Sequence, residues 1–213
     1  KKEQFPTDSV HHGEFNQLVA RVSELTGRAK RKYAVEPTVF FDINWVKEGG
    51  VGTRLTVSDS ALFLLDRENG ALYEVGLEQK KSTILGTSEL FKEGISMALF
   101  QDRPYVFVEG GTPKVVNEKG NEAIAPNDSW GPILDSKSFG GNIYLLDRNN
   151  QIWKHPGSEY GFGSGSAWLN EDVQVDFSNA KSFAIDGNIW VLTTTGINKL
   201  AVGGQDPFFL KDE

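Results

Sequence analysis

A two-stranded hairpin unit recurs along this chain. Its clearest copy spans residues 141–155, where a short apolar run leads into a turn at 147–150 and then into an alternating strand. Asp and Asn suit that turn because their short side chains bond to the local backbone and tolerate positive φ. Related copies occupy residues 62–75, 105–116 and 189–201. The chain therefore repeats one small antiparallel unit, which strongly limits the folds open to it.

The spacing of the copies indicates which repeat architecture this is. Phe63, Val106, Tyr144 and Trp190, taken as equivalent points, lie 43, 38 and 46 residues apart, which is the size of one four-stranded propeller blade. We predict an all-β chain that forms a partial β-propeller over residues 37–213, with four blades visible. The predicted innermost strands of these blades are residues 54–57, 96–100, 137–139 and 181–185.

The end of the chain leaves the last blade incomplete. Its outer strand is missing unless residues 206–210 begin it, and residues 38–46 look like an outer strand that seals a ring. Closed propellers usually carry about four to eight blades. We therefore expect either that about two blades lie outside this sequence or that the ring stays open, with an exposed edge near residues 200–213.

The N-terminal segment differs from the rest. Residues 1–36 read as a polar lead-in followed by an amphipathic helix between Gly13 and Tyr33, which ends before Pro37. Such a helix either packs against its own domain or forms a stalk that continues upstream. The apolar positions of the helix, at a/d spacing, are Phe15, Leu18, Val22, Leu25 and Ala29.

Composition excludes several classes of function. The 213 residues carry a net charge of −7, which disfavours binding to a phosphate backbone, so no nucleic-acid partner is expected. The absence of cysteine excludes disulfides and thiolate chemistry. No apolar run is long enough to span a membrane, and the first residues lack the basic, apolar, small-residue order of a signal peptide, so a membrane is expected only through a segment outside this sequence. Because the chain begins with lysine, we expect it to be part of a longer protein.

The candidate binding residues lie at one end of the predicted blades. The start of an inner strand and the turn after the second strand share that end, which predicts a mixed-charge rim. The aspartates in the turns also have a purely structural interpretation, and Arg67 and Arg148 have one as inter-blade salt bridges. Trp130 and Trp168 either pack between blades or stack on sugar rings. The predicted rim residues are Arg54, Asp66, Arg67, Trp130, Lys137, Asp147, Arg148, Asn149 and Lys181.

Other motifs carry little chemistry. The glycine-rich residues 160–166 lack the lysine and the following helix of a phosphate loop. The pair at 11–12 and the single His155 do not assemble a metal site or a nucleophile relay. Residues 171–176 are acidic but lack the glycine and terminal glutamate of a calcium loop. We expect no catalytic residue, no metal and no cofactor.

Two resemblances add to this interpretation. The segment IYLLDRNNQIWKH resembles the core of NHL-type propeller repeats. The segments FFDINWV with TRLTV, and SFAIDGNIWVLTTTGINKL, make residues 14–210 similar to a family of bacterial membrane-anchored proteins. That resemblance implies a cytoplasmic serine/threonine phosphatase-like domain, a transmembrane helix, a helical stalk and a six-bladed extracytoplasmic propeller. It supplies no catalytic residue for this chain.

Three functions remain open at this stage. The first is a non-enzymatic ligand- or protein-binding module, the extracytoplasmic sensor or scaffold of a membrane-anchored parent. The second is a glycan-binding, lectin-like propeller that uses Trp130 and Trp168. The third is a propeller hydrolase or lyase, which the single histidine of the blades and the lack of clustered carboxylates disfavour.

Overall fold

The chain divides into two compact units, Lys1–Phe41 and Asp42–Glu213. The computed structural model describes residues 11–30, 36–109 and 112–208. The first unit contains one helix, α1 (His12–Lys30), none of whose described residues is buried. The predicted lead-in and the last residues of the predicted helix, 31–33, lie largely outside the described residues. No helix in the described part of the chain combines the length and apolar character needed to cross a bilayer.

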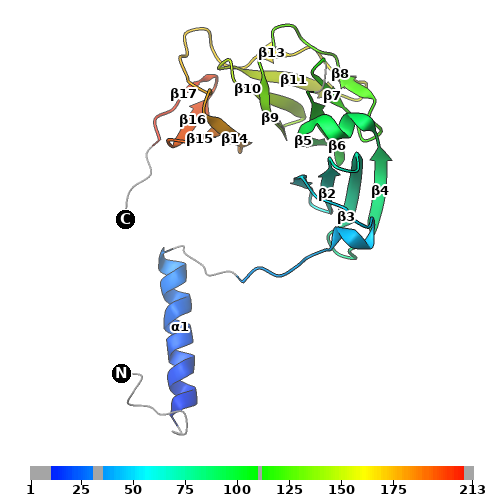
Figure 1. The fold of residues 1–213 in the computed structure, drawn as a ribbon. Coiled ribbons are helices and arrows are strands. Elements are labelled where there is room, and N and C mark those ends of the chain that lie inside the picture. The colour runs from blue at the N-terminus through cyan, green and yellow to red at the C-terminus, as the bar shows by residue number, and fades with distance from the viewer. Residues whose placement is uncertain (1–10, 31–35, 110–111, 209–213) are drawn as a thin grey trace. The chain divides into compact units, whose positions relative to one another are not determined.

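The second unit consists of four antiparallel sheets, each built from strands that follow one another along the chain (Figure 1). The first sheet contains β1 (Arg54–Val57), β2 (Ala61–Asp66), β3 (Ala71–Gly76) and β4 (Ser82–Thr87). The second contains β5 (Gly94–Phe100), β6 (Arg103–Val108), β7 (Lys114–Val116) and β8 (Glu122–Ile124). The third contains β9 (Ile133–Phe139), β10 (Asn142–Asp147), β11 (Ile152–Ser158), β12 (Gly161–Phe162) and β13 (Ser166–Ala167). The fourth contains β14 (Ala180–Ile185), β15 (Ile189–Thr193), β16 (Ile197–Ala201) and β17 (Gly204–Gln205).

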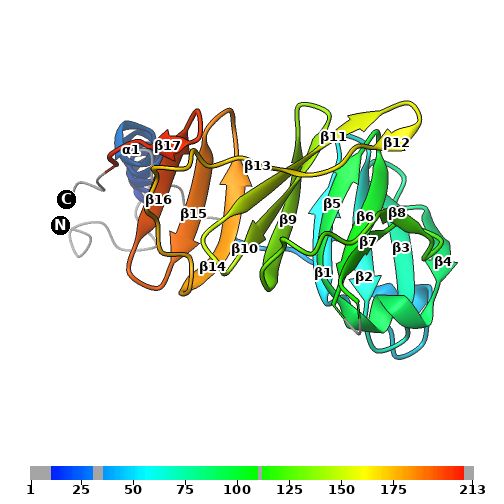
Figure 2. The same ribbon diagram turned by 90° about the horizontal axis from the view of Figure 1, so that it is seen from above.

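The four sheets are the blades of an open β-propeller. Their first strands, β1, β5, β9 and β14, are the innermost, and each contacts the next. The sheets follow one another along an arc in Figure 1 and stand side by side in Figure 2. Within the described residues the first and the fourth blades face an opening and do not meet (Figure 1). The predicted all-β fold with about four blades is confirmed.

Each blade has two ends that the strand connections define. The turns between first and second strands lie at what we name the inner-turn end, and the turns between second and third strands lie at the Asp-turn end. The predicted glycine turns are present at the inner-turn end: Gly140 and Gly141 have φ of 55° and 75°, and Gly187 has φ of 112°. Glycine adopts these values without steric cost, which explains the tight hairpins.

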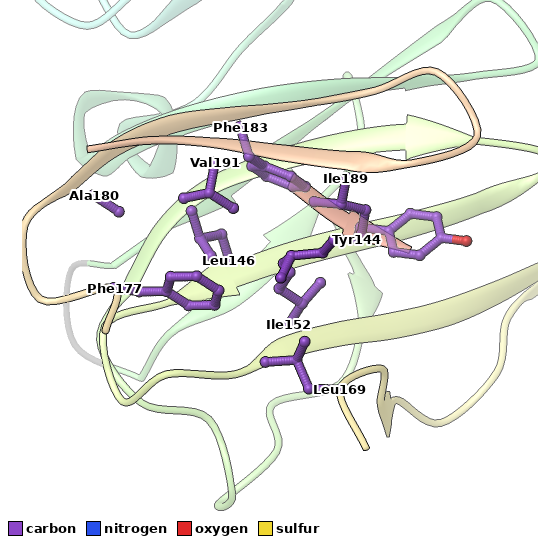
Figure 3. Packing of buried hydrophobic residues seen from close by; sticks show 10 residues of the cluster. Tyr144, Leu146, Ile152, Leu169, Phe177, Ala180, Phe183, Ile189 and Val191 are labelled. Atoms are coloured by element: carbon purple, nitrogen blue, oxygen red, sulfur yellow. The ribbon is translucent and has the colours of Figure 1, made fainter. Parts of the chain in front are cut away.

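The hydrophobic core lies between the blades, in three clusters that each join two successive sheets. Figure 3 shows the cluster between the third and fourth blades, where Tyr144 and Leu146 meet Phe183 and Val191. The cluster between the first two blades contains both Phe63 and Val106, so Val106 faces the preceding blade whereas Phe63 faces the following one. Taking Val106 as the equivalent of Phe63 was therefore wrong about the face, because period-two alternation reverses sides with a one-residue displacement.

An aromatic side chain from each connecting segment fills the joint between two blades. Phe91, Trp130 and Phe177 each stand three residues before the inner strand of the following blade. Phe91 and Phe177 are 0% exposed, and Trp130 is half-buried. Burial of a large aromatic side chain contributes several kcal/mol at most, typically about 1.5–3 kcal/mol. We name these side chains wedges.

The same capping turn precedes two of the wedges. The side chains of Ser88 and Asn127 accept a hydrogen bond from the backbone N–H two residues later, at 3.2 and 2.9 Å. Their carbonyls accept from the backbone N–H of the wedges Phe91 and Trp130, at 3.1 and 3.0 Å. Serine and asparagine favour such turns because their side chains compete for backbone hydrogen bonds. This capping turn holds the backbone of the aromatic residue that stands three positions after the capping residue.

Two sequence predictions about the ends of the propeller were wrong. Residues 38–46 do not form a strand, since Asp42 caps the short 3-10 helix η2 (Ile43–Trp45) with a 3.0 Å bond from the N–H of Asn44. An aspartate that binds its local backbone in this way competes with strand pairing. The fourth strand of the last blade is β17, so it precedes residues 206–210 and does not begin with them.

Candidate binding surface

The aspartates of the Asp-turn end are used inside their own blades. Asp147 is 1% exposed and accepts hydrogen bonds from the backbone N–H of Gly131 and Gln151, both at 3.0 Å. It also accepts a 2.7 Å bond from Nε1 of Trp153. These bonds fasten the turn to the segment that leads into the blade. Asp147 is therefore a structural residue, in agreement with the turn interpretation.

Asp66 repeats this arrangement in the first blade. It is 0% exposed and accepts from the backbone N–H of Val51 and Asn69 at 3.0 and 2.9 Å, and from Nδ2 of Asn69 at 2.8 Å. Burial pushes the pKa of this carboxyl upward, but the hydrogen bonds outweigh burial and leave the pKa below its ordinary value. Asp66 is thus a charged anchor within the blade.

Arginines of the predicted rim connect neighbouring blades through backbone carbonyls. Arg67 Nε donates to the carbonyl of Lys92 at 3.0 Å, and Arg148 Nη1 donates to that of Ser178 at 2.9 Å. Both acceptors directly follow a wedge. Arg54 Nε donates to the carbonyl of Ile95 on the next inner strand at 2.6 Å. All three arginines therefore make inter-blade contacts. For Arg67 and Arg148 the partners are carbonyl groups and not the carboxylates of the predicted salt bridges.

The two predicted rim lysines lie in different places. Lys137 pairs with Tyr144 in the middle of β9, because the strand begins four residues earlier than predicted. It does not lie at the start of an inner strand, and its ammonium binds Asp135 at 2.9 Å. Asp135 in turn accepts a 3.3 Å bond from the N–H of Phe183 on β14. Lys181, by contrast, lies exposed at the start of β14, at the Asp-turn end.

Trp130 and Asn149 lie at the joint between the second and third blades. The Trp130 ring packs edge-on against His155 at 5.5 Å between centroids and lies 6.1 Å from the ring of Phe107. Asn149 packs over Gly131, where a Cβ would come within 2.6 Å of its side chain. These contacts match the packing interpretation of Trp130 and leave little of its ring for a sugar.

His155 is a buried polar residue in the joint between the second and third blades. It is 1% exposed, and its Nδ1 lies 3.3 Å from the carbonyl of Gly163. Burial lowers the pKa of the imidazole, so the ring is neutral at pH 7. Gly165 allows the ring to fit, because a Cβ there would come within 2.4 Å of it. The glycine-rich residues 160–166 therefore serve as a close-fitting outer connection.

A different surface is open at the inner-turn end. A hollow of about 570 Å³ lies between the second and third blades, lined by the turns at 99–101, 138–141 and 157–159. The rings of Phe100 and Phe139 line it, and Phe139 is 40% exposed. A Cβ on Gly157 would come within 2.7 Å of the Phe100 ring, so glycine there permits the close approach. Phe100 is held in place by the Phe162 ring, 4.9 Å away.

Other apolar and acidic side chains lie in turns at the same end of the four blades. Tyr160 and Val202, in the turns between third and fourth strands, are 92% and 91% exposed. Exposed carboxylates stand in the inner turns, at Asp59, Asp102 and Asp186. The pKa of Asp186 lies below its ordinary value because Trp190 and Asn188 donate hydrogen bonds to it. The inner-turn end thus combines aromatic surface with negative charge.

Sequence reasoning missed this surface and the wedges. Both had signals: an apolar residue directly before the glycine turn at 140–141, and the recurrence of an aromatic residue three positions after a capping residue. The acidic residues 171–176 form a surface turn in which Asp176 accepts a 2.9 Å bond from the N–H of Ser178. Among the residues that the structure describes, no three His, Asp or Glu side chains gather into a potential metal site.

Comparison with known proteins identifies the fold alone. Neither a protein-family model nor a curated protein matches this chain. The designed protein Ika4 matches with 11% identity and a TM-score of 0.51, over 79% of this chain and 100% of that one. The structure titled as a nidogen/laminin complex matches with 10% identity and a TM-score of 0.50, over 79% of this chain and 81% of that one.

A third similar structure is longer than this chain. BamB from Moraxella catarrhalis has 13% identity and a TM-score of 0.44, and the match covers 68% of this chain and 41% of BamB. The chain therefore spans less than half the length of that protein. At 10% and 11% identity, the similarity to the nidogen/laminin structure and to Ika4 concerns the fold alone.

Proposed function

We propose that the second unit is a non-enzymatic protein-binding module that holds its partner at the inner-turn end. The observation that carries this proposal is the hollow lined by Phe100 and Phe139. Aromatic side chains are enriched where proteins bind one another, and a central apolar pocket is the usual site of an anchoring side chain. With a volume of about 570 Å³, the hollow has room for one large side chain of a partner.

Charge defines the second property of the partner. Asp102 follows Phe100 in the turn, and Glu159 lines the hollow. The inner turns also carry Asp59 and Asp186, and Arg103 follows one of these turns at the start of β6. The turns between third and fourth strands at the same end hold both charges, with Glu78, Glu118 and Glu159 beside Lys80, Lys81 and Lys119. Electrostatic complementarity favours a basic partner and speeds its association. The proposed partner is therefore a segment that places an aromatic or aliphatic anchor beside lysine or arginine.

The Asp-turn end is less suited to this role. Asp66 and Asp147 are buried and hydrogen-bonded within their blades. Arg67 and Arg148 are engaged with backbone carbonyls of the next blade. Side chains that already satisfy structural bonds would have to lose them before binding a ligand, and each loss costs about 1–3 kcal/mol. These contacts favour the inner-turn end over the rim proposed from sequence.

Peptide selection tests the proposal directly. The full chain is immobilised and offered a phage-displayed library of random peptides, and selected peptides are measured by fluorescence polarisation. We expect enrichment of peptides that combine Phe, Trp or Leu with Lys or Arg. Phe139→Ser should weaken their binding by at least about tenfold, as truncation of an anchor contact does. Glu159→Lys should weaken it and reduce its salt dependence.

The control is a residue of similar exposure elsewhere. Ile84 is 47% exposed on the outer strand of the first blade, so Ile84→Ser should leave peptide affinity unchanged. Selected peptides that bind the Phe139→Ser variant as tightly as the wild type would refute the assigned surface. Enrichment of acidic peptides, or of none, would refute the assigned partner.

We further propose that this module is the extracytoplasmic part of a membrane-anchored bacterial protein, with NHL-like repeats in a ring of six blades. The sequence resemblance described above supports this, and so does α1, whose Leu18 and Val22 are each 62% exposed, as in a stalk that contacts something outside its own unit. Protease added to intact cells that express the full-length parent should cleave the module. Protection until the cells are lysed would place it inside.

A further inference from the structure

Two buried side chains in the joint between the second and third blades have a polar atom without a hydrogen-bond partner among the described residues. These atoms are Nε1 of Trp130 and Nε2 of His155. The two rings are in edge-on contact, with their centroids 5.5 Å apart. Most buried polar atoms in proteins are hydrogen-bonded, and leaving one unpaired costs about 1–3 kcal/mol. Two such atoms in adjacent rings point to a hydrogen-bonding group from outside the chain.

The two atoms have opposite hydrogen-bonding needs. The carbonyl of Gly163 can only accept, so the proton of the neutral His155 ring lies on Nδ1, which donates to that carbonyl at 3.3 Å. Nε2 of His155 is then an acceptor that needs a donor. Nε1 of Trp130 is a donor that needs an acceptor. A hydroxyl group meets either need, because it donates one hydrogen bond and accepts others.

A cleft of about 530 Å³ lies beside His155, at the outer strands of these two blades. One wall consists of residues 124–129, which begin at the end of β8. The other consists of residues 162–165, between β12 and β13. We name it the outer cleft. Its volume lies within the range of small-molecule sites, about 300–1,000 Å³.

The unpartnered atom of His155 faces this cleft. His155 is 1% exposed and lines the cleft, as Gly165 does. A Cβ on Gly165 would come within 2.5 Å of Nε2, so residues 163–165 cover this atom. Two of these three residues are glycines, which change backbone conformation at little steric cost. A ligand in the cleft therefore reaches Nε2 when this short segment moves outward.

The rest of the lining fits a neutral ligand that carries hydroxyl groups. Asp128 is the one charged side chain among the described residues that line the cleft, and it is exposed. Ser129 and Ser164 add hydroxyls, and Phe162 adds a half-buried ring. An anion would meet a carboxylate and no cation in this lining. An ammonium group would have to lose its water beside a neutral imidazole, which is costly.

We propose that the outer cleft binds a neutral saccharide, one hydroxyl of which donates a hydrogen bond to Nε2 of His155. A sugar ring carries several hydroxyls on a small frame, so others can accept from Nε1 of Trp130 and donate to the carboxylate of Asp128. Trp130 contributes its N–H and not a stacking face, because its ring packs against Phe107 and His155. The outer cleft shares no lining residue with the hollow at the inner-turn end.

Nuclear magnetic resonance of the imidazole nitrogens tests the proposal in the full chain with isotope-labelled histidine. The chain has three histidines, so His11 and His12 serve as references in the same spectrum. Glucose, galactose, mannose, N-acetylglucosamine, cellobiose and chitobiose are titrated in turn. We expect at least one of them to shift the Nε2 signal of His155 saturably and to leave both references unchanged. Methylammonium chloride and inorganic phosphate should leave the His155 signal unchanged.

Two variants locate the bound sugar, with affinity measured by isothermal titration calorimetry. His155→Phe keeps an aromatic ring but removes the acceptor, and should weaken binding by at least about tenfold. Asp128→Ala alters an exposed side chain, so it should leave the fold intact by circular dichroism and weaken binding by at least about threefold. Asp59→Ala is the matched control, because Asp59 is an exposed aspartate in a turn of the first blade. It should leave the affinity for the sugar unchanged.

Several results would overturn the proposal. A His155 signal that no sugar shifts would do so, and so would a signal that responds to methylammonium or phosphate. Affinity that survives either His155→Phe or Asp128→Ala would also overturn it. An Nε2 signal that is typical of a hydrogen-bonded acceptor before any sugar is added, and that no sugar changes, would assign the atom to a bound water instead. None of these results bears on the peptide-binding surface, which is tested through Phe139 and Glu159.

Discussion

Truncation of the wedge Phe91 should show how much the packing between blades contributes to the free energy of unfolding. Phe91 is 0% exposed and lies in the cluster between the first two blades. Truncation of a buried phenylalanine to alanine costs about 3–5 kcal/mol, which comprises the lost transfer free energy and the cavity left behind. The folded state of a protein is stable by about 5–15 kcal/mol, so Phe91→Ala should remove roughly a third of it.

Urea unfolding followed by far-ultraviolet circular dichroism measures this loss. With a urea dependence of about 2 kcal/mol per molar, the midpoint of Phe91→Ala should fall by about 2 M. Trp45→Ala is the matched control, because Trp45 occupies the same position after its cap but is 77% exposed. Because its side chain is largely exposed, Trp45→Ala should change stability by less than about 0.5 kcal/mol. A loss below about 1 kcal/mol for Phe91→Ala, or an equal loss for both, would refute the account of the wedges.

Three further predictions concern the turns. Asp147→Ala leaves the N–H groups of Gly131 and Gln151 and Nε1 of Trp153 without their acceptor, and should lower stability by about 2–4 kcal/mol in thermal unfolding. An unchanged melting temperature would contradict the structural role. The pKa of Asp66 is lowered in the folded state, so its stabilisation is present above the unfolded pKa of about 3.9 and is lost as pH falls through the folded pKa. Asp66→Asn should therefore flatten stability measured against pH below about 4, and an unaltered acid transition would count against it. Val202 is 91% exposed and has φ of 50°, a strained backbone conformation for a β-branched residue, so Val202→Asn should stabilise the unit by about 1 kcal/mol in urea unfolding. An unchanged midpoint would contradict this strain.

The fold was largely predictable because its main signals are local. The glycines at 140–141 and the turn at 147–150 fix a hairpin through backbone φ and short-range hydrogen bonds, and period-two alternation identifies the buried face. These signals do not require knowledge of distant residues. The face of Val106 was misassigned because the turn after β6 carries Glu109 in place of the aspartate that marks the register at Asp66 and Asp147.

The binding surface was harder to predict because it depends on pairing between distant segments. The sequence predicts Arg148 and Lys181 equally as cations of the rim. The structure shows that Arg148 donates a hydrogen bond to the carbonyl of Ser178, whereas Lys181 is exposed. Phe100 and Phe139 belong to different blades, and the hollow between them arises from inter-blade packing. Residues 38–46 were misread because the local bond of Asp42 outweighs their strand-like composition.

The location of a selected basic peptide on the propeller is the most direct test of the account. A crystal structure of the complex, or chemical-shift changes on titration, should place the peptide over Phe100 and Phe139 with its cations beside Asp102 and Glu159. A peptide bound instead at the Asp-turn end, against Arg67 and Arg148, would contradict the central claim that this end holds the blades together while the inner-turn end recognises the partner.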